Sequence, residues 1–255
     1  MARILAISSQ VVFGPVGLSA VVPALQAAGH EVLALPTIVL SSHPGHGKPV
    51  GAAQDIASLI SALEKLGALK NIDAVLTGYF ANAAQVQIVA DLLSRLQCSI
   101  VLVDPVLGDH GRLYVSEDVA VAIRDLLLPA ATIVTPNVFE LSWLSGQIVP
   151  DKDTAIRVAH SLMIENVIVT SVPLEGDQLG TVLVAATEVF QVSSPHLKSV
   201  PHGTGDYLSG LFLARQFSRE KKTALQDSVS ILQRAIALSG DSGVLAVAEA
   251  LHKSL

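Results

Sequence analysis

Short runs of aliphatic, mostly β-branched residues alternate with longer amphipathic stretches along most of this sequence. Compact apolar runs are typical of buried strands, and longer stretches with apolar residues three or four apart are typical of helices that face a core. The predicted strands are Arg3–Ser8, Glu31–Leu35, Asp73–Thr77, Ser99–Asp104, Thr132–Thr135, Val167–Thr170 and Thr181–Ala185. The predicted helices between them are Val16–Ala28, Ala52–Leu66, Asn82–Leu96, Ser116–Leu127, Asn137–Leu144 and Thr154–Met163.

The pattern becomes entirely helical after Gly205, with predicted helices at Asp206–Phe217, Thr223–Leu238 and Gly243–His252. Strands that alternate with helices indicate βαβ units, a parallel sheet and right-handed crossovers. No repeat, low-complexity segment or linker rich in Gly, Ser or Pro divides the chain. We therefore expect a single α/β domain over residues 1–255 with a central, mostly parallel sheet.

Composition narrows the class of protein. Of the 255 residues, 51% are apolar and 15% are charged, which supplies a large core without disulfides. The one cysteine, Cys98, forms no internal disulfide and fits a reducing compartment. The first apolar run is too short for a signal peptide, and no apolar run is long enough to span a membrane. The net charge of −6 argues against a general nucleic-acid binder. These features predict a cytoplasmic protein with a small-molecule partner.

The stretch Thr37–Gly51 is the one long segment without a regular pattern. Loops of this length in compact domains are often functional, so a lid and a plain surface crossover are equally consistent with it. It contains His43 and His46, three residues apart. A loop metal pair is one interpretation, but no third ligand is placed, so solvated loop histidines fit better.

Polar side chains follow the predicted strands at their carboxyl ends. In a doubly wound sheet, ligands bind at this edge. The polar residues concerned are Ser8, Ser9, Thr77, Tyr79, Asp104, Asp109, Thr135, Glu140 and Thr170. The carboxylates among them suit Mg²⁺ held partly through water and nucleotide phosphates. Asp104 and Asp109 are also explained as turn formers, and Glu140 as a first-turn helix acid, without any metal.

The segment Pro201–Asp206 precedes an apolar helix and contains the turn Gly203-Thr204-Gly205-Asp206. The glycines allow a sharp turn, and the free N–H groups and partial positive charge of a helix start favour a phosphate. Asp206 is placed to accept a proton from a hydroxyl nucleophile. Taken alone, the turn fits an ordinary glycine turn better. No G-x-x-x-x-G-K-[ST], G-x-G-x-x-G or G-x-S-x-G motif is present.

In combination, these segments resemble the pyridoxal kinases of the ribokinase superfamily, in unbroken order from Ile4 to about Phe217. The segments that carry the resemblance are Ile7–Gly14 with Val16-Gly17, Thr37–Lys48, Leu76–Tyr79, Asp104–Asp109, Leu113–Asp118, Thr135–Glu140 and Gly203–Asp206. The resemblance implies a ribokinase-like, three-layer α/β/α fold. It also implies phosphorylation of the 5′-hydroxymethyl of pyridoxal, with pyridoxine and pyridoxamine as further vitamin B6 acceptors.

The resemblance also implies residue roles. Asp206 would be the catalytic base, and Gly203, Thr204 and Gly205 would form the anion hole. Ser9, Val16, His43 and Tyr79 would contact the vitamin together with Asp206. Asp104, Asp109, Tyr114, Thr135, Glu140, Thr170 and Thr204 would surround ATP. Asp104 and Glu140 would act on Mg²⁺, Glu140 through water. A homodimer is implied, and a monovalent cation is left open.

The sequence departs from the family pattern on the vitamin side. Gln10 stands where the family usually has His, and Ser8 where it has Gln. Ser42-His43-Pro44 replaces Asn-His-Thr, which removes a hydroxyl donor. The alternative functions are a hydroxymethylpyrimidine kinase, which typically carries Cys at position 206, a non-catalytic vitamer-binding protein, and a sugar kinase. Asp206 favours a pyridoxal kinase over the first two, and no Gly-Gly sugar motif lies near the N-terminus.

Overall fold

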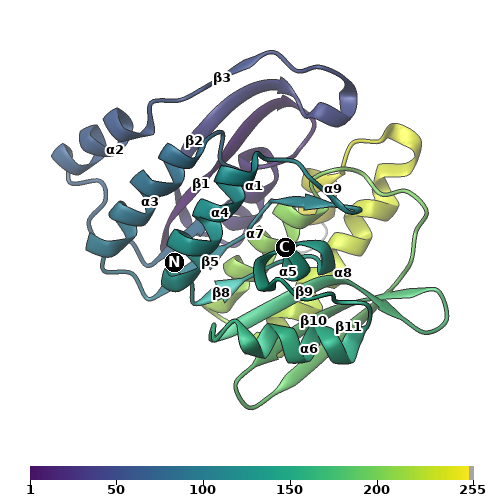
Figure 1. Cartoon of the computed structure of the whole chain (residues 1–255). Helices are drawn as coiled ribbons and strands as arrows, with labels where there is room; N and C mark the ends of the chain where they lie inside the picture. The colour runs from purple at the N-terminus through teal and green to yellow at the C-terminus, as the bar shows by residue number, and fades with distance from the viewer. Residues whose placement is uncertain (253–255) are drawn as a thin grey trace.

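The computed structural model describes residues 1–252, and these form a sheet between two layers of helices (Figure 1). The nine-stranded sheet has the order β11-β10-β9-β8-β5-β4-β1-β2-β3. Its strands are β1 (Arg3–Phe13), β2 (Glu31–Ser42), β3 (Gly51–Ala53), β4 (Ala74–Thr77), β5 (Ile100–Val103), β8 (Ile133–Val134), β9 (Asn166–Leu174), β10 (Gln178–Ala185) and β11 (Val189–Pro195). A separate hairpin consists of β6 (Gly108–Asp109) and β7 (Arg112–Leu113).

The central strands are parallel, from β9 through β8, β5, β4 and β1 to β2. Only the outer pairs, β9–β10, β10–β11 and β2–β3, are antiparallel. Parallel strands bring their carboxyl ends to one edge, so the residues that follow β4, β5 and β8 meet there. The predicted, mostly parallel sheet is confirmed.

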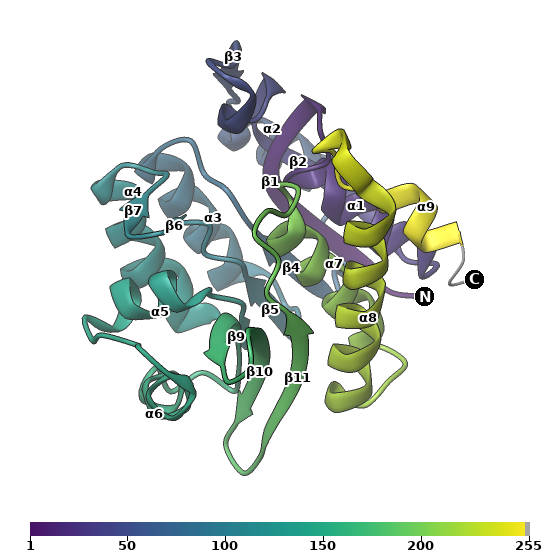
Figure 2. The same cartoon turned by 90° about the vertical axis from the view of Figure 1, so that its right-hand side faces the viewer.

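Helices cover both faces of the sheet. The bounds are α1 (Leu18–Ala27), α2 (Ile56–Lys65), α3 (Ala83–Arg95), α4 (Glu117–Ala122), α5 (Val138–Ser145), α6 (Lys152–Ser161), α7 (Thr204–Gln216), α8 (Lys221–Ser239) and α9 (Val247–His252). Helices α2 to α6 pack on one face around Val75, Val103 and Val134, and α1, α7 and α8 pack on the other around Leu76, Leu102 and Ile133. Figure 2 shows the two layers on either side of the sheet.

The segment Thr37–Gly51 is more regular than predicted. Strand β2 continues to Ser42, a single 3-10 turn covers Pro44–His46, and β3 then pairs antiparallel with β2. The polar and half-exposed side chains of this sheet edge hide the strand pattern, because only one face of it is covered. Because β3 occupies Gly51–Ala53, the helix predicted from Ala52 begins only at Ile56. Asp55 caps this helix and accepts a hydrogen bond from the Ser58 N–H.

Three further elements differ from prediction. Strand β11 was not expected, because an exposed edge strand alternates only weakly between apolar and polar residues. The helix predicted at Ser116–Leu127 is α-helical only to Ala122 and ends in a π-helical turn, Ile123–Leu127. The last helix starts at Val247 rather than Gly243, after a 3-10 turn at Gly240–Ser242.

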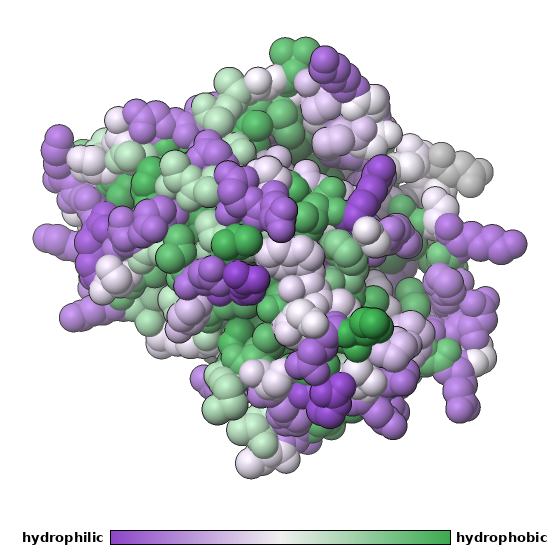
Figure 3. Space-filling view, in the orientation of Figure 1, coloured by the Kyte–Doolittle hydropathy of each residue, from purple (hydrophilic) through white to green (hydrophobic). Residues whose placement is uncertain are grey.

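The face of the molecule in Figure 3 shows no extended apolar band among the described residues. On the face shown in Figure 3, hydrophilic side chains are spread over the molecule, with hydrophobic residues in small groups among them. Exposed apolar residues in small numbers are normal for a folded protein. Among residues 1–252, no helix is both long and apolar enough to cross a bilayer.

Candidate active site

The turn Gly203–Asp206 forms the N-terminal end of α7. Gly203 has a φ of 92°, and the Tyr207 N–H donates to its carbonyl oxygen over 2.9 Å. A Cβ on Gly203 would overlap the carbonyl oxygen of Pro15 and lie 3.1 Å from Val16 Cγ1, so only glycine fits there. A Cβ on Gly205 would meet no atom within 4 Å outside its own helix. The first turn of α7 therefore has open space for a phosphate.

The Asp206 carboxylate lies beside the ends of β1 and β4. It accepts a hydrogen bond from the Gly17 N–H, and burial raises its pKa to about 6. A Cβ on Gly78, the residue after β4, would lie 3.9 Å from Asp206 Oδ1 and closer still to Ser8 Oγ. Gly78 thus leaves room beside the carboxylate. A carboxyl group with a pKa near 6 is well matched to proton acceptance near neutral pH.

Asp104 is held in place by α7. Its side chain is only 7% exposed, and Oδ2 accepts a hydrogen bond from Ser209 Oγ over 2.8 Å. Ser209 Oγ also lies 3.0 Å from Thr135 Oγ1, which completes a buried chain of three polar side chains. Burial raises the pKa of Asp104 well above its usual range, and the charges of Asp206 and Glu140 add to this. The acids are therefore close enough to influence each other's charge.

Glu140 forms a capping box with Asn137 at the start of α5. Glu140 Oε2 accepts from the Asn137 N–H over 2.9 Å, and Asn137 Oδ1 accepts from the Glu140 N–H over 2.9 Å. Glu140 Oε1 accepts from the Leu107 N–H over 2.8 Å and more weakly from the Gly108 N–H. Burial raises the pKa of Glu140 to about 7 despite these donors. Glu140 thus has the structural role of a first-turn helix acid, and it also links α5 to the loop after β5.

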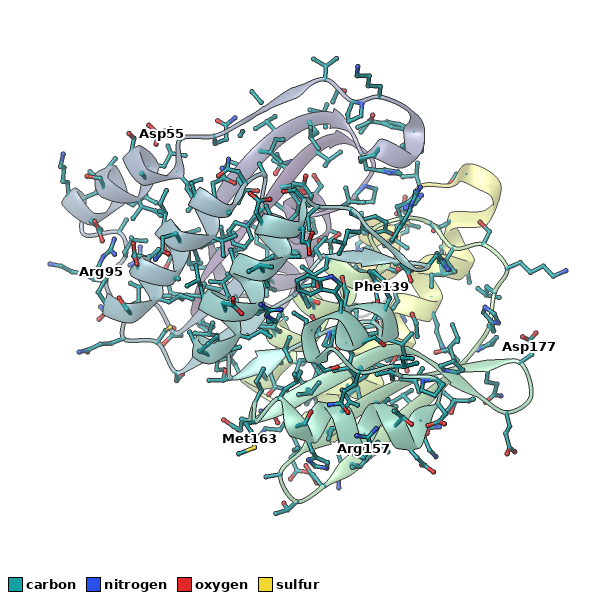
Figure 4. The ribbon with its side chains drawn as sticks, in the orientation of Figure 1. Asp55, Arg95, Phe139, Arg157, Met163 and Asp177 are labelled. Atoms are coloured by element: carbon teal, nitrogen blue, oxygen red, sulfur yellow. The ribbon has the colours of Figure 1, made fainter. Side chains whose placement is uncertain are left out.

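The loop after β5 is strained where it meets Glu140. Val106 has a φ of 45°, which is unusual for a β-branched residue and orients the following N–H groups. Asn137 Nδ2 donates to the Gly108 carbonyl oxygen over 2.8 Å, and a Cβ on Gly108 would lie 2.7 Å from Phe139 Cε1. Phe139, labelled near the centre of Figure 4, thus packs the β6–β7 hairpin against α5.

Asp109, Tyr114 and Thr170 lie at the outer part of the same edge. Asp109 Oδ1 accepts from the His110 N–H over 2.7 Å. Tyr114 is 55% exposed, and its pKa is raised by partial burial and then by the charges of Asp109 and Glu140. The Thr170 N–H donates to the Pro136 carbonyl oxygen over 2.9 Å. Thr170 lies within β9 rather than at its end, because β9 continues to Leu174.

Ser9, Val16 and Tyr79 lie on the β1 side of Asp206. Ser9 is buried within β1, at a shift in register against β2 between Ser8 and Gln10. A Cβ on Gly17 would overlap Ser9, so the chain after Val16 runs directly against it. The Tyr79 N–H donates to Ser8 Oγ over 3.1 Å, and Thr37 Oγ1 donates to the Tyr79 carbonyl oxygen over 2.7 Å. These contacts join β1, β2 and β4 at one point.

His43 is not the solvated loop histidine that the sequence favoured. Its side chain is 7% exposed, and its Nδ1 accepts from the Gly45 N–H over 2.9 Å. Its ring centroid lies 4.2 Å from that of His46 and 4.2 Å from that of His202. Within residues 1–252, no group of three or more metal-ligating side chains is arranged to hold a metal ion.

Sequence reasoning named Ser8, Gly17 and His202 only as parts of motifs, without a role in the site, and it missed Ser209. Ser209 had a detectable signal, because a serine three residues after Asp206 stands in an otherwise apolar run. Gln10 has a local role as well, since its Nε2 donates to Ser19 Oγ over 2.9 Å. The other contacts depend on chain segments that are distant in sequence.

Comparison with known proteins identifies the family of this chain. The family model described as phosphomethylpyrimidine kinase matches residues 52–247. The pyridoxal kinase PdxY of Leifsonia xyli is 33% identical over 257 residues, covering 94% of this chain and 90% of the relative. This chain belongs to the pyridoxal kinase family. The resemblance found in the sequence motifs is thereby confirmed.

Solved pyridoxal kinases share the fold. The crystal structure of pyridoxal kinase from Entamoeba histolytica has a TM-score of 0.93 at 25% identity, covering 99% of this chain and 95% of that one. Pyridoxal kinase from Leishmania donovani, in complex with ADP and pyridoxine, has a TM-score of 0.91 at 30% identity, covering 98% and 94%. The predicted ribokinase-like, three-layer fold is confirmed.

Proposed function

We propose that this member of the pyridoxal kinase family transfers the γ-phosphate of ATP to the 5′-hydroxymethyl of pyridoxal, and also accepts pyridoxine or pyridoxamine. The position of Asp206 carries the proposal. It lies at the N-terminal end of α7, between the Ser9–Tyr79 side of the edge and the buried carboxylate of Asp104. Such a position allows one group to meet both an acceptor hydroxyl and a phosphate. The Leishmania donovani relative bound to ADP and pyridoxine supports the same assignment of partners.

Asp206 acts as the base in this proposal. It takes the proton from the acceptor hydroxyl as the hydroxyl oxygen attacks the γ-phosphorus and ADP leaves. The N–H groups of Gly203, Thr204 and Gly205 donate hydrogen bonds to the transferred phosphoryl group and stabilise the negative charge on its oxygens. Positioning and electrostatic stabilisation are the main tasks of a kinase site. The backbone donors at the accessible first turn of α7, which is anchored by its buried residues Tyr207–Ala214, support both tasks.

Ser9, Val16, His43 and Tyr79 form the acceptor side of the proposed site. Val16 also touches the anion-hole turn through its contact with Gly203. On the other side, Asp104, Asp109, Tyr114, Thr135, Glu140, Thr170 and Thr204 surround ATP. The hairpin β6–β7 brings Asp109 and Tyr114 towards this side.

The carboxylates present fit Mg²⁺ bound together with ATP. Burial raises the pKa values of Asp104 and Glu140, and neighbouring carboxylates add to both shifts, so a divalent cation would stabilise the charged forms of these groups. One or two carboxylates, together with nucleotide phosphates and water, are enough to bind this ion. Asp104 would contact it, and Glu140 would do so through water. When bound, Mg²⁺ would neutralise phosphate charge. A monovalent cation is a further part of the proposal to be tested.

The assembly and location proposed for the protein follow the family resemblance. We expect the whole chain to act as one kinase unit, to form a homodimer and to be cytoplasmic. We expect no nucleic-acid partner, because the net charge of −6 gives no general attraction to nucleic acid.

An acceptor panel tests the function directly. Purified protein with ATP and Mg²⁺ is offered pyridoxal, pyridoxine, pyridoxamine and hydroxymethylpyrimidine, and the phosphorylated product is measured. Phosphorylation of at least one B6 vitamer is expected. Turnover with the pyrimidine alone would overturn the proposal in favour of the second candidate, which the phosphomethylpyrimidine kinase family model supports. Binding of vitamer without turnover would instead indicate a storage protein.

A further inference from the structure

Four aromatic rings from three separate segments form a row at the acceptor side. Phe13 is the last residue of β1, and its ring centroid lies 5.2 Å from that of His46. The rings of His46, His43 and His202 follow in sequence, each 4.2 Å from the next. The interplanar angles are 56°, 52° and 47°, so each contact is tilted, as aromatic pairs prefer.

The row joins the acceptor side to the anion hole. His43 caps the single turn after β2, His46 is the last residue of that turn, and His202 directly precedes Gly203. A Cβ on Gly45 would lie 2.7 Å from His202 Nε2, so the backbone of this turn also sits against the His202 ring. The strand ends that carry the turn project beyond the rest of the sheet at the top of Figure 2. A contact at the tip of these strand ends therefore helps to fix the position of the turn.

The His43 ring in the middle of the row is suited to neutral stacking. Its Nδ1 accepts the Gly45 N–H, which places any proton of the neutral ring on Nε2. Burial, together with the charges of His202 and His46, lowers the pKa of His43 to about 4. At neutral pH the central ring carries no charge, so no repulsion between like charges opposes the row.

We propose that His202 is a positioning residue, which stacks on His43 and thereby fixes the Pro44–His46 turn beside the anion-hole turn, so that the acceptor is held in reach of Asp206. The proposal rests on the proposed kinase function for its effect on the reaction. His202 itself takes no part in proton or phosphoryl transfer. Its effect is to reduce the freedom that the turn must lose when the acceptor binds.

Kinetics of two substitutions test this role, with the acceptor identified by the panel above. His202→Ala removes the ring and is expected to raise the acceptor KM by about 2- to 12-fold, the factor that corresponds to one aromatic contact of about 0.5–1.5 kcal/mol. The KM for ATP and the kcat should change less. His202→Phe keeps a flat ring and should restore the acceptor KM. His160→Ala, an exposed histidine in α6, is the matched control.

Hydrogen exchange tests the contact without any substrate. In His202→Ala, amide exchange over residues 41–51 should be faster than in the wild type, and the Gly45 amide should be among those affected. In His202→Phe the exchange should be close to the wild type. Equal exchange in all three proteins, or equal acceptor KM in the Ala and Phe variants, would overturn the positioning role. Because the exchange experiment needs no turnover, it still gives a result if the vitamer assignment is wrong.

Discussion

The two sides of the candidate site are built in different ways. On the phosphate side, defined here by Asp104, Thr135, Glu140 and Ser209, hydrogen bonds connect buried side chains on the sheet and on helices α5 and α7. On the acceptor side, defined by Ser9, Val16, His43 and Tyr79, backbone contacts and stacked rings connect strand extensions at the edge of the sheet. The phosphate side is thus fixed by the core, and the acceptor side by contacts near the surface.

This difference separates two kinds of constraint. Phosphoryl transfer from ATP requires hydrogen-bond donors and carboxylates in fixed positions. Rigid helices and strands hold these groups with little conformational freedom. Acceptor recognition is carried by segments that have fewer buried contacts, such as the exposed strand β3 and the turn before it. Changes on the phosphate side should therefore affect stability and turnover together, and changes on the acceptor side should affect mainly acceptor affinity.

Asp206→Asn should have the largest effect, because Asp206 lies where the two sides meet. Loss of a general base is expected to lower kcat by about 10²- to 10⁴-fold, with the acceptor KM and the folded structure retained. Steady-state kinetics and circular dichroism measure both. Asp153→Asn, at an exposed first-turn acid of α6, is the control and should be fully active. Undiminished kcat in Asp206→Asn would exclude the proposed mechanism.

Gly203→Ala should disturb both sides at once. The positive φ of 92° costs about 1–3 kcal/mol for a residue with a Cβ, and the overlap with the Pro15 carbonyl oxygen adds to it. Urea unfolding and kcat/KM should both show the loss. Gly146→Ala has a similar φ of 67° but open space around its Cβ, so only the backbone cost applies. Equal losses in the two variants would contradict the close contact between Gly203 and the Pro15 carbonyl oxygen.

Ser209→Ala tests the phosphate side alone. It removes the donor to buried Asp104, and a loss of about 1–3 kcal/mol in the free energy of unfolding is expected, with a higher KM for ATP. The acceptor KM should change little. Ser228→Ala is the control, since this buried hydroxyl only bonds a carbonyl within its own helix. A specific increase in acceptor KM in Ser209→Ala would break the division into two sides.

The pH dependence of turnover should report Asp206 with the smallest of these effects. Its pKa of about 6 is above the usual value of 3.8, so the base is protonated, and inactive, over a wider acidic range than usual. We expect kcat/KM for the acceptor, which reports the free enzyme, to be constant above neutral pH and to fall about tenfold from its plateau by pH 5. The residual activity of Asp206→Asn should lack this inflection. An inflection that persists there would assign the titration to another group.

The sequence predicted the phosphate side better than the acceptor side. Local patterns identify its parts: Asn137 and Glu140 are three residues apart and form a capping box, and Gly203–Asp206 precedes an apolar helix. The parallel sheet then brings the polar strand ends to one edge, which the βαβ pattern also predicts.

The acceptor side depends on contacts that no local pattern encodes. His202 meets His43 across more than 150 residues of sequence. His43 is therefore buried although the local pattern favours a solvated histidine, whereas His46 is exposed as expected. The extension of β2 to Ser42 was hidden because an edge strand with one covered face contains many polar residues. In both cases the decisive interaction is tertiary, so sequence periodicity carries little information about it.

The burial of α7 links catalysis to heat resistance. Eight consecutive residues of this helix, from Tyr207 to Ala214, are buried, and Gly210 lets it approach α1 so closely that a Cβ would lie 3.1 Å from the Val21 Cα. The anion-hole turn cannot shift without this helix, and the helix cannot shift without the core. On warming, the catalytic turn should therefore stay in place until the whole domain melts, so that thermal inactivation of turnover and loss of helical circular dichroism coincide in a single transition.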